Sequence, residues 1–168
     1  FGCNVESEQA YEACSRPVAG GGGLHEIDLY LTVRRCSGLE AGLYRYDPQD
    51  HQLLRLSALS EACKQLLLEA CQGAALTQEP DILIALAARY GRVSWKYEGM
   101  PYALILKHVG VIYQQLYLVA TALGLAPCGL GAGNSETFAQ ATGLDRFAHI
   151  PVGEFILGRP AEIKQESC

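Results

Sequence analysis

Alternating apolar and polar residues predict three neighbouring β-strands in the first third of the chain. In residues 27–33, apolar side chains at every second position alternate with more polar ones, which is typical of a half-buried strand. Residues 43–46 and 52–56 are the second and third strands, because the turn residues Asp47 and Pro48 follow the second one directly. We expect these last two strands to form a hairpin.

The pattern then changes to a helical period and next to an unbroken apolar run. Ser57 or Ser60 is placed to cap a helix that continues through Cys71, with apolar residues on one face and Gly73 at its end. Residues 81–88 are almost all apolar without alternation. Such a run predicts a strand buried on both faces in the middle of a sheet.

The longest apolar segment, residues 102–123, predicts a helix that is buried on several sides. Apolar residues occupy nearly every direction around its helical projection, Pro101 fits its first turn, and Gly124 supplies a stop. Its length would suffice to cross a bilayer. The Lys107-His108 pair in its middle and the lack of a flanking basic loop argue against a membrane span, so we expect a core helix.

Weaker signals organise the two ends of the chain. Asn134 or Ser135 caps a short helix that ends at Gly143, and residues 152–157 form a last strand. Residues 1–15 lack a clear period, which predicts an irregular arm or one short helix in residues 6–14. We therefore expect an arm (1–15), one domain (16–160) and an exposed tail (161–168).

The composition of the chain indicates an ordinary globular domain and argues against some classes of binding partner. The chain has 168 residues, of which 49% are hydrophobic and 18% charged, as in an ordinary globular domain. A net charge of −5 without a cluster of lysines or arginines argues against nucleic acid as a partner. We expect neither nucleic-acid nor membrane binding.

The seven cysteines show neither CxxC spacing nor the histidine pattern of a zinc site. No secretory signal is visible, so we expect a cytoplasmic protein with free thiols rather than disulfides. The chain begins at Phe1 without methionine. We interpret this start as that of a fragment or of one domain of a longer protein.

Two glycine-rich segments could bring the main chain close to a ligand. Residues 20–23 lack side chains that would block such an approach, although a flexible loop explains them equally. Residues 129–133 are similar to a dinucleotide-binding turn, but that motif follows a strand, and here a helix is expected before it. A Rossmann site is therefore disfavoured. A ligand-binding loop and a plain connector between two helices both remain open.

Few residues have the chemistry of a catalytic site. Lys96 and Tyr97 are adjacent groups able to move protons, and Trp95 could provide dry surroundings for a base, although a solvated loop is the simpler explanation. The pairs His25-Glu26 and Lys107-His108 are best interpreted as structural. No metal-ligand spacing and no GxSxG serine supports a metalloenzyme or a hydrolase.

Five sequence blocks between Arg16 and Pro160 carry a family resemblance. In order they read GGGGLHEIDLYLTV, GLEAGLYRYDP, WKYEGMPYALILKHVG, LYLVATALGLAPCGLGAGN and VGEFILGRP. Together they resemble the SagB-type dehydrogenases, a branch of the FMN-dependent nitroreductase superfamily that oxidises thiazolines and oxazolines to thiazoles and oxazoles in peptide natural products.

The resemblance implies an α+β, nitroreductase-like fold with a central, mainly antiparallel sheet flanked by helices and a long buried central helix. It also implies a homodimer with FMN at the subunit interface. The pattern of residues 102–123 agrees, because a helix that is apolar on nearly all sides needs more cover than one small domain supplies, and a symmetric partner would provide it.

Roles for individual residues follow from the same resemblance. Lys96 and Tyr97 fall on the Lys-Tyr pair assigned to proton abstraction. The family's arginine- and serine-rich phosphate-binding segment is not found, so Lys107 and two arginines are candidate phosphate contacts. The cofactor-binding residues implied in this way are Arg16, Gly20, Gly21, Gly22, Gly23, Gly131, Ala132, Gly133 and Arg159.

Three functional hypotheses remain open. The first is an azoline oxidase that acts on a peptide or carrier-bound substrate and uses molecular oxygen to reoxidise FMN. The second is an NAD(P)H-dependent nitro or quinone reductase, which would not need the Lys-Tyr base. The third is a catalytically silent partner in a synthetase complex, which is suggested because Ala19-Gly20 replaces the family's usual proline and serine.

Overall fold

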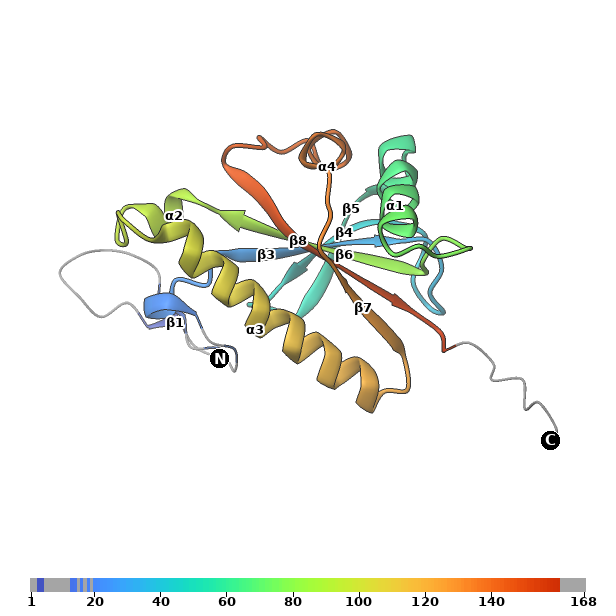
Figure 1. The fold of residues 1–168 in the computed structure, drawn as a ribbon, viewed down its shortest axis with the longest axis horizontal. Coiled ribbons are helices and arrows are strands. Elements are labelled where there is room, and N and C mark those ends of the chain that lie inside the picture. The colour runs from blue at the N-terminus through green and yellow to red at the C-terminus, as the bar shows by residue number, and fades with distance from the viewer. Residues whose placement is uncertain (1–2, 5–12, 15, 17, 19, 161–168) are drawn as a thin grey trace.

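The computed structural model describes residues 3–4, 13–14, 16, 18 and 20–160, and a six-stranded sheet forms its centre (Figure 1). The strands lie in the order β5-β4-β3-β6-β8-β7, and every neighbouring pair is antiparallel. Their bounds are β3 Ile27–Val33, β4 Gly42–Asp47, β5 Gln52–Ala58, β6 Ile82–Arg89, β7 Ala126–Leu130 and β8 His149–Gly158. The predicted α+β class with a mainly antiparallel central sheet is confirmed.

The helices begin and end at residues with recognisable local signals. Their bounds are η1 Gly21–Gly23, α1 Glu61–Gly73, α2 Gly91–Ser94, α3 Pro101–Ala122 and α4 Ser135–Thr142. The Ser60 hydroxyl accepts a hydrogen bond from the Cys63 N–H, and the Asn134 side chain accepts from two N–H groups in the first turn of α4. Gly143 ends α4 in a left-handed conformation with a φ of 71°.

Helices cover both faces of the sheet, and β6 supplies the residues that join the two halves of the core. Ala85 and Ala87 of β6 pack with α1 and α4, whereas Leu86 and Ala88 pack with α3. Figure 1 accordingly shows α1 and α4 on one side of the sheet and α3 on the other. The prediction that the apolar run at residues 81–88 is a central strand is therefore confirmed, because both faces of β6 are buried.

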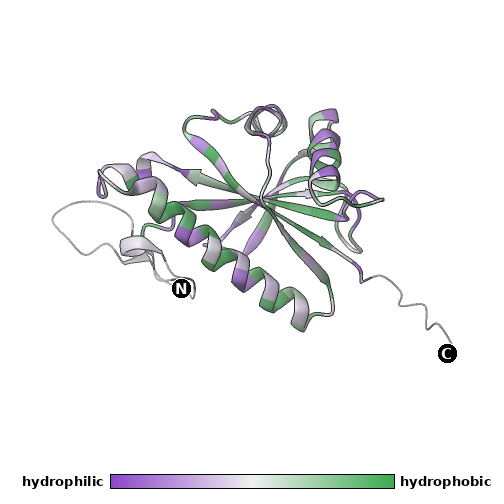
Figure 2. Cartoon of the chain, in the orientation of Figure 1, coloured by the Kyte–Doolittle hydropathy of each residue, from purple (hydrophilic) through white to green (hydrophobic). Residues whose placement is uncertain are grey.

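Helix α3 is not buried on several sides, so that prediction is wrong for the single chain. Only 22% of its most apolar 18-residue window is buried, and apolar patches follow its visible length in Figure 2. By length and composition alone α3 could cross a membrane, but Ile105 and Val109 pack on the sheet. The large apolar side chains that it leaves exposed are Tyr102, Leu106, Val111, Tyr117, Leu118 and Val119.

The glycine-rich segment after α3 also differs from the prediction. Residues 129–133 were interpreted either as a ligand-binding loop or as a connector between two helices, with a helix directly before them. Residues 126–130 instead form β7, an edge strand paired with β8, so a strand precedes the 131–133 loop. Pro127 and Gly129 lower the strand propensity of this segment, so its sequence does not predict a strand. An edge strand tolerates both residues. Strand β8 is also longer than predicted, beginning at His149 rather than Val152.

The N-terminal arm is described only in part. Strands β1 (Cys3–Asn4) and β2 (Ala13–Cys14) pair as a two-stranded ribbon. The predicted short helix in residues 6–14 is therefore wrong at Ala13 and Cys14, and its other residues lie outside the described part of the chain.

Cysteines and other soft or acidic ligands do not form clusters in the described part of the chain. Cys36, Cys63, Cys71 and Cys128 are free thiols. Within the same residues, no group of three or more histidine, cysteine, aspartate or glutamate side chains is placed to hold a metal ion.

Candidate functional site

Gly22 of η1 lies against the two residues predicted to move protons. A side chain on Gly22 would place its Cβ 2.6 Å from Lys96 Nζ and 3.1 Å from the Tyr97 hydroxyl oxygen. Gly22 also has a φ of 59°, a left-handed conformation that favours glycine. The structure thus places Gly22 against two adjacent residues that follow it by more than seventy positions in the sequence.

Short-range contacts hold Lys96 and Tyr97 in place. Both follow α2, whose Val93 is fully buried, and the N–H groups of Lys96 and Tyr97 donate to the Val93 carbonyl at 3.1 and 3.0 Å. Arg92 Nε donates to the Leu24 carbonyl at 2.7 Å, which ties α2 to the loop after η1. Lys96 Nζ lies 5.8 Å from the centre of the Tyr97 ring, within cation–π range.

A second proton-transfer group lies against the neighbouring glycine. A Cβ on Gly21 would be 3.1 Å from His108 Cε1 and 3.5 Å from its Nε2. His108 Nδ1 lies 2.6 Å from Glu26 Oε1, and both side chains are buried. A carboxylate can only accept, so Nδ1 carries the proton and Nε2 is left to face other groups.

Sequence reasoning missed the pair of Glu26 and His108. It interpreted both His25-Glu26 and Lys107-His108 as structural, and the structure joins one member of each across 82 positions. No local spacing could have revealed this contact. Beside it, His25 has a φ of 43°, a conformation that is uncommon for a non-glycine residue.

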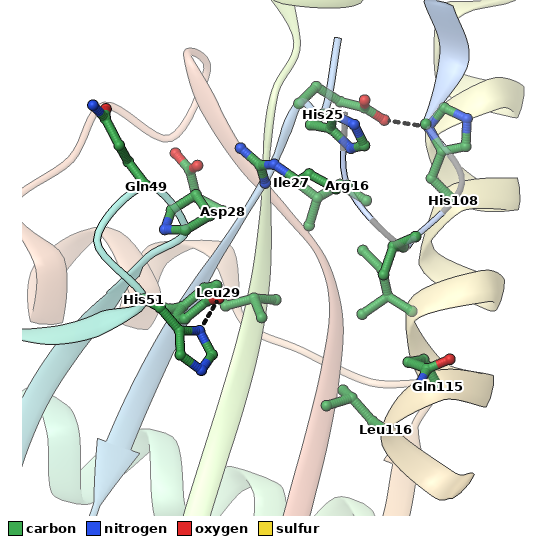
Figure 3. A pocket seen from close by; sticks show the side chains of 16 residues that line it. Arg16, His25, Ile27, Asp28, Leu29, Gln49, His51, His108, Gln115 and Leu116 are labelled. Atoms are coloured by element: carbon green, nitrogen blue, oxygen red, sulfur yellow. Dashed lines mark hydrogen bonds and ion pairs between the residues drawn. The ribbon is translucent and has the colours of Figure 1, made fainter. Parts of the chain in front are cut away.

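A cavity of about 490 Å³ opens beside this loop, between α3, β3 and the β4–β5 turn (Figure 3). Its walls are mainly apolar and include Ile27, Leu29 and Leu116. The polar side chains that line it are Arg16, His25, Glu26, Asp28, Tyr46, Gln49, His51, His108 and Gln115. A largely apolar cavity of this size with a few polar groups is typical of a small-molecule site.

The second predicted glycine loop lies elsewhere in the chain. Gly133 packs against Glu154, and Ala132 lies near Gly73 of α1, so the 131–133 loop is on the α1 and α4 side of the sheet. Gly21 instead contacts α3 through Leu104 and His108. One chain therefore does not bring the two glycine loops together, and their shared role stays a prediction.

The other predicted phosphate contacts are also apart from the Gly20–Gly23 loop. Arg159 Nε lies 3.9 Å from Asp81 Oδ2, just before β6, whereas Lys96 follows the opposite end of β6. Lys107 is exposed on α3. Arg16, by contrast, lines the cavity.

Glu154 is a buried carboxyl group beneath the 131–133 loop that sequence reasoning also missed. Its exposed fraction is 4%, and Glu69 and Glu154 line a small cavity of about 260 Å³ together with residues of that loop. Burial first, and the negative charge of Glu69 second, raise the pKa of Glu154 to about 7. The carboxyl group is therefore largely protonated below neutral pH.

Comparison with known proteins assigns this architecture to a family. The chain matches the sequence pattern of the Nitroreductase family over residues 8–159, nearly its whole length. The chain belongs to the nitroreductase family. It is 32% identical over 117 residues to a protein of Methanocaldococcus jannaschii provisionally named a nitroreductase, a match that covers 70% of this chain and 58% of that protein.

Solved structures share the nitroreductase fold with this chain. A nitroreductase-like protein from Anabaena variabilis superposes with a TM-score of 0.74 at 20% identity, covering 90% of this chain and 31% of that one. The Escherichia coli microcin synthetase McbBCD complex with truncated pro-MccB17 contains a chain with a TM-score of 0.74 at 20% identity, covering 95% and 60%. At these identities the likeness establishes the fold alone.

This nitroreductase chain is shorter than its relatives. It spans 58% of the M. jannaschii protein and between 31% and 66% of the similar solved chains. Family membership supports an oxidoreductase of the flavin type.

Proposed function

We propose that this chain is an FMN-dependent oxidase that converts thiazoline or oxazoline rings in peptides to thiazoles or oxazoles. The observation that carries the proposal is the position of Lys96 Nζ and the Tyr97 hydroxyl against Gly22, in the loop whose Gly20 and His25 line the cavity. Oxidation of an azoline must remove a ring proton as well as a hydride. A site with a lysine and a tyrosine at its glycine loop has the groups that such a proton transfer needs.

The described residues fit a flavin. The cavity of about 490 Å³ is within the range of roughly 300–1,000 Å³ typical of small-molecule sites, and its apolar walls suit a planar ring. Main-chain groups of Gly20–Gly23 and Gly131–Gly133 would hold it, with Arg16 as a cationic contact. A bound FMN supplies the hydride acceptor of the reaction.

Proton transfer is the step that the chain's own residues perform. One ring C–H bond would break with its proton passing to Lys96 Nζ, and its electron pair would form the new ring double bond as a hydride leaves the neighbouring ring carbon for the acceptor that FMN would supply. Tyr97 orients or relays this proton through its hydroxyl group. The buried position of Val93 and the bond from Arg92 to the Leu24 carbonyl keep both groups at the loop.

We propose a homodimer as the working unit. The two glycine loops lie on opposite faces of the sheet in one chain, so a second copy is the simplest way to bring both to one flavin. The apolar side chains left exposed on α3 offer a surface for that copy. The microcin synthetase structure contains a precursor peptide, which supports a peptide substrate, and molecular oxygen is the proposed final oxidant.

The test is a comparison of two assays on the purified chain. We expect a flavin absorbance spectrum, oxygen-dependent conversion of a thiazoline peptide that lowers its mass by two hydrogens, and slow NADPH oxidation in the absence of that peptide. Rapid NADPH-driven reduction of a quinone without thiazoline conversion would instead identify a reductase. A chain that binds no FMN would identify a catalytically silent partner.

A further inference from the structure

Two carboxyl groups line the small cavity on the α1 and α4 side of the sheet. This cavity of about 260 Å³ is lined by residues of α1, β7, β8 and the loop that follows β7. Its lining residues are Glu69, Leu130, Ala132, Gly133, Asn134 and Glu154. None of these described residues is a lysine or an arginine, so the lining itself does not compensate the charge of the two carboxylates.

Hydrogen bonds hold Glu69 in a position that leaves one of its oxygen atoms without a donor. Its Oε1 accepts from Gln65 Nε2 at 3.0 Å, from Asn134 Nδ2 at 3.2 Å and from Thr137 Oγ1 at 3.1 Å. Its Oε2 is buried and has no hydrogen-bond partner in the described part of the chain. A buried carboxylate oxygen without a partner is costly, so this atom indicates a positively charged group beside it.

Glu154 reaches the same cavity from the sheet. It lies opposite Ala85 of β6 and Leu130 of β7, whose side chains pack under α1 and α4, so its side chain is on that face. Its exposed fraction is 4%, and no group among the described residues donates a hydrogen bond to its carboxyl group. A Cβ on Gly133 would lie 3.2 Å from Glu154 Oε1, so the glycine leaves room for the carboxyl group. Glu154 is therefore a buried acidic side chain that faces the cavity without a partner.

We propose that Glu69 Oε2 and the Glu154 carboxyl group bind a hydrated divalent cation of the Mg²⁺ or Mn²⁺ type. Two carboxylates balance the charge of such a cation, and oxygen atoms are the ligands that these hard cations prefer. Mg²⁺ is typically held by one or two carboxylates and keeps several water molecules. The cavity has room for them, because each water molecule takes up about 30 Å³ in the liquid.

A cation in this cavity would join parts of the chain that are far apart in the sequence. Glu69 belongs to α1 and Glu154 to β8, and the 131–133 loop lies beside both carboxyl groups. Because the two ligands come together only in the folded chain, cation binding would stabilise that state. The proposed oxidation has no step at the cation, so binding can be tested whether or not the chain oxidises an azoline.

The experiment measures Mn²⁺ binding to the purified chain after treatment with a chelator. Free Mn²⁺ is followed by electron paramagnetic resonance at pH 8, above the pKa of about 7 of Glu154, so that a proton competes little with the cation. We expect one bound cation per chain that Mg²⁺ displaces, and a thermal unfolding midpoint that rises with Mn²⁺ concentration. Glu154→Gln and Glu69→Gln should each weaken binding by about 10- to 100-fold, the size of a lost interaction with a charged group.

Glu61→Gln is the matched control, because Glu61 is on the same helix as Glu69, but its side chain is 88% exposed and paired with Lys64. It should bind Mn²⁺ as wild type does. Glutamine keeps the shape of the side chain, and far-UV circular dichroism checks the fold of each variant. If one of the two cavity variants does not fold, the other decides.

Three results would overturn the cation site. A wild-type chain that binds no Mn²⁺ at millimolar concentration would show that the two carboxyl groups share a proton instead. Wild-type affinity in the folded Glu154→Gln and Glu69→Gln variants would show an adventitious ion only, bound elsewhere on the surface. Equal weakening in Glu61→Gln would show that the general negative charge of the chain, and not this cavity, attracts the cation.

Discussion

Gly22 shows how an absent side chain defines the candidate site. Its left-handed backbone and the short distances to Lys96 and Tyr97 mean that any other residue would be strained and would also displace the two proton-transfer groups. A Cβ on Gly21 would lie 2.8 Å from Leu104 Cδ2 and 3.1 Å from His108 Cε1, so space alone favours glycine there. The glycines are therefore needed for close packing against reactive groups, a requirement that flexibility alone would not impose.

Lys96→Ala should lower the rate of thiazoline oxidation by about 10²- to 10⁴-fold, the usual contribution of a general base. Flavin content should stay at the wild-type level, because Lys96 acts on the substrate proton. Tyr97→Phe should lose less activity if its hydroxyl group relays or orients. The measurement is kcat with a thiazoline peptide on protein of known flavin content.

Two outcomes would contradict this assignment of Lys96. Near-normal turnover with bound flavin would show that another group, such as His108, is the base. Loss of flavin without a change in the fold would show that Lys96 is a cofactor contact.

Glu154 makes the stability of the folded chain depend on pH. Its pKa is raised from 4.5 to about 7, so the folded state holds the proton more tightly than the unfolded state does. Relative to an ionised Glu154, the favourable contribution of the protonated carboxyl group to folding stability is fully present below about pH 4.5. It is lost as the pH rises through 7, because the unfolded chain releases this proton more readily than the folded chain. A shift of this size corresponds to about 3 kcal/mol.

Glu154→Gln should therefore be more stable than wild type at pH 8, by up to about 3 kcal/mol, with a smaller difference at pH 5. Urea unfolding at both pH values measures the effect. Glu136→Gln is the control, since Glu136 is an exposed glutamate paired with Arg146, and it should show no such pH dependence. An equal difference at the two pH values would disprove the role of Glu154 ionisation.

Among the secondary-structure elements, the sequence correctly predicted those whose bounds are set by local periodicity and by capping residues. Strand β3 was predicted at its observed bounds, and the Ser60 and Asn134 caps were among the expected ones. Strand β7 was missed because Pro127 and Gly129 weaken a strand signal, and its pairing with β8 comes from residues far along the chain. The contact of Glu26 with His108 was missed because helix packing, not spacing, creates it.

The loop between β7 and α4 gives a test of the predicted flavin contacts at Gly131–Gly133. A Cβ on Gly131 meets no atom within 4 Å, so Gly131→Val should fold normally. We expect it to lose bound FMN, because a branched side chain would block the main-chain N–H groups from the ring. Absorbance of the purified variant and its thermal unfolding curve measure the two effects separately. Undiminished flavin content would show that this loop does not contact the cofactor.

The exposed apolar face of α3 bears on the oligomeric state of the protein. An apolar face of this length on one chain is unusual for a monomer and typical of an interface. The sequence pattern predicted burial on several sides, because it shows which residues are apolar but not whether the same chain or a second chain covers them. A symmetric pair of α3 helices would reconcile the pattern with the structure.

Leu118→Asp should therefore convert a dimer to a folded monomer. Leu118 is 58% exposed in the single chain, so a charge there leaves the fold of one subunit intact, whereas at a dimer interface it would be buried without a partner. Sedimentation velocity at micromolar concentration measures the mass, and far-UV circular dichroism confirms the fold. Leu56→Asp is the control, because Leu56 is 47% exposed on the edge strand β5, away from α3. Wild type that sediments as a monomer, or a Leu118→Asp variant that stays dimeric, would show that α3 does not join two copies, and the two glycine loops would then need another way to meet.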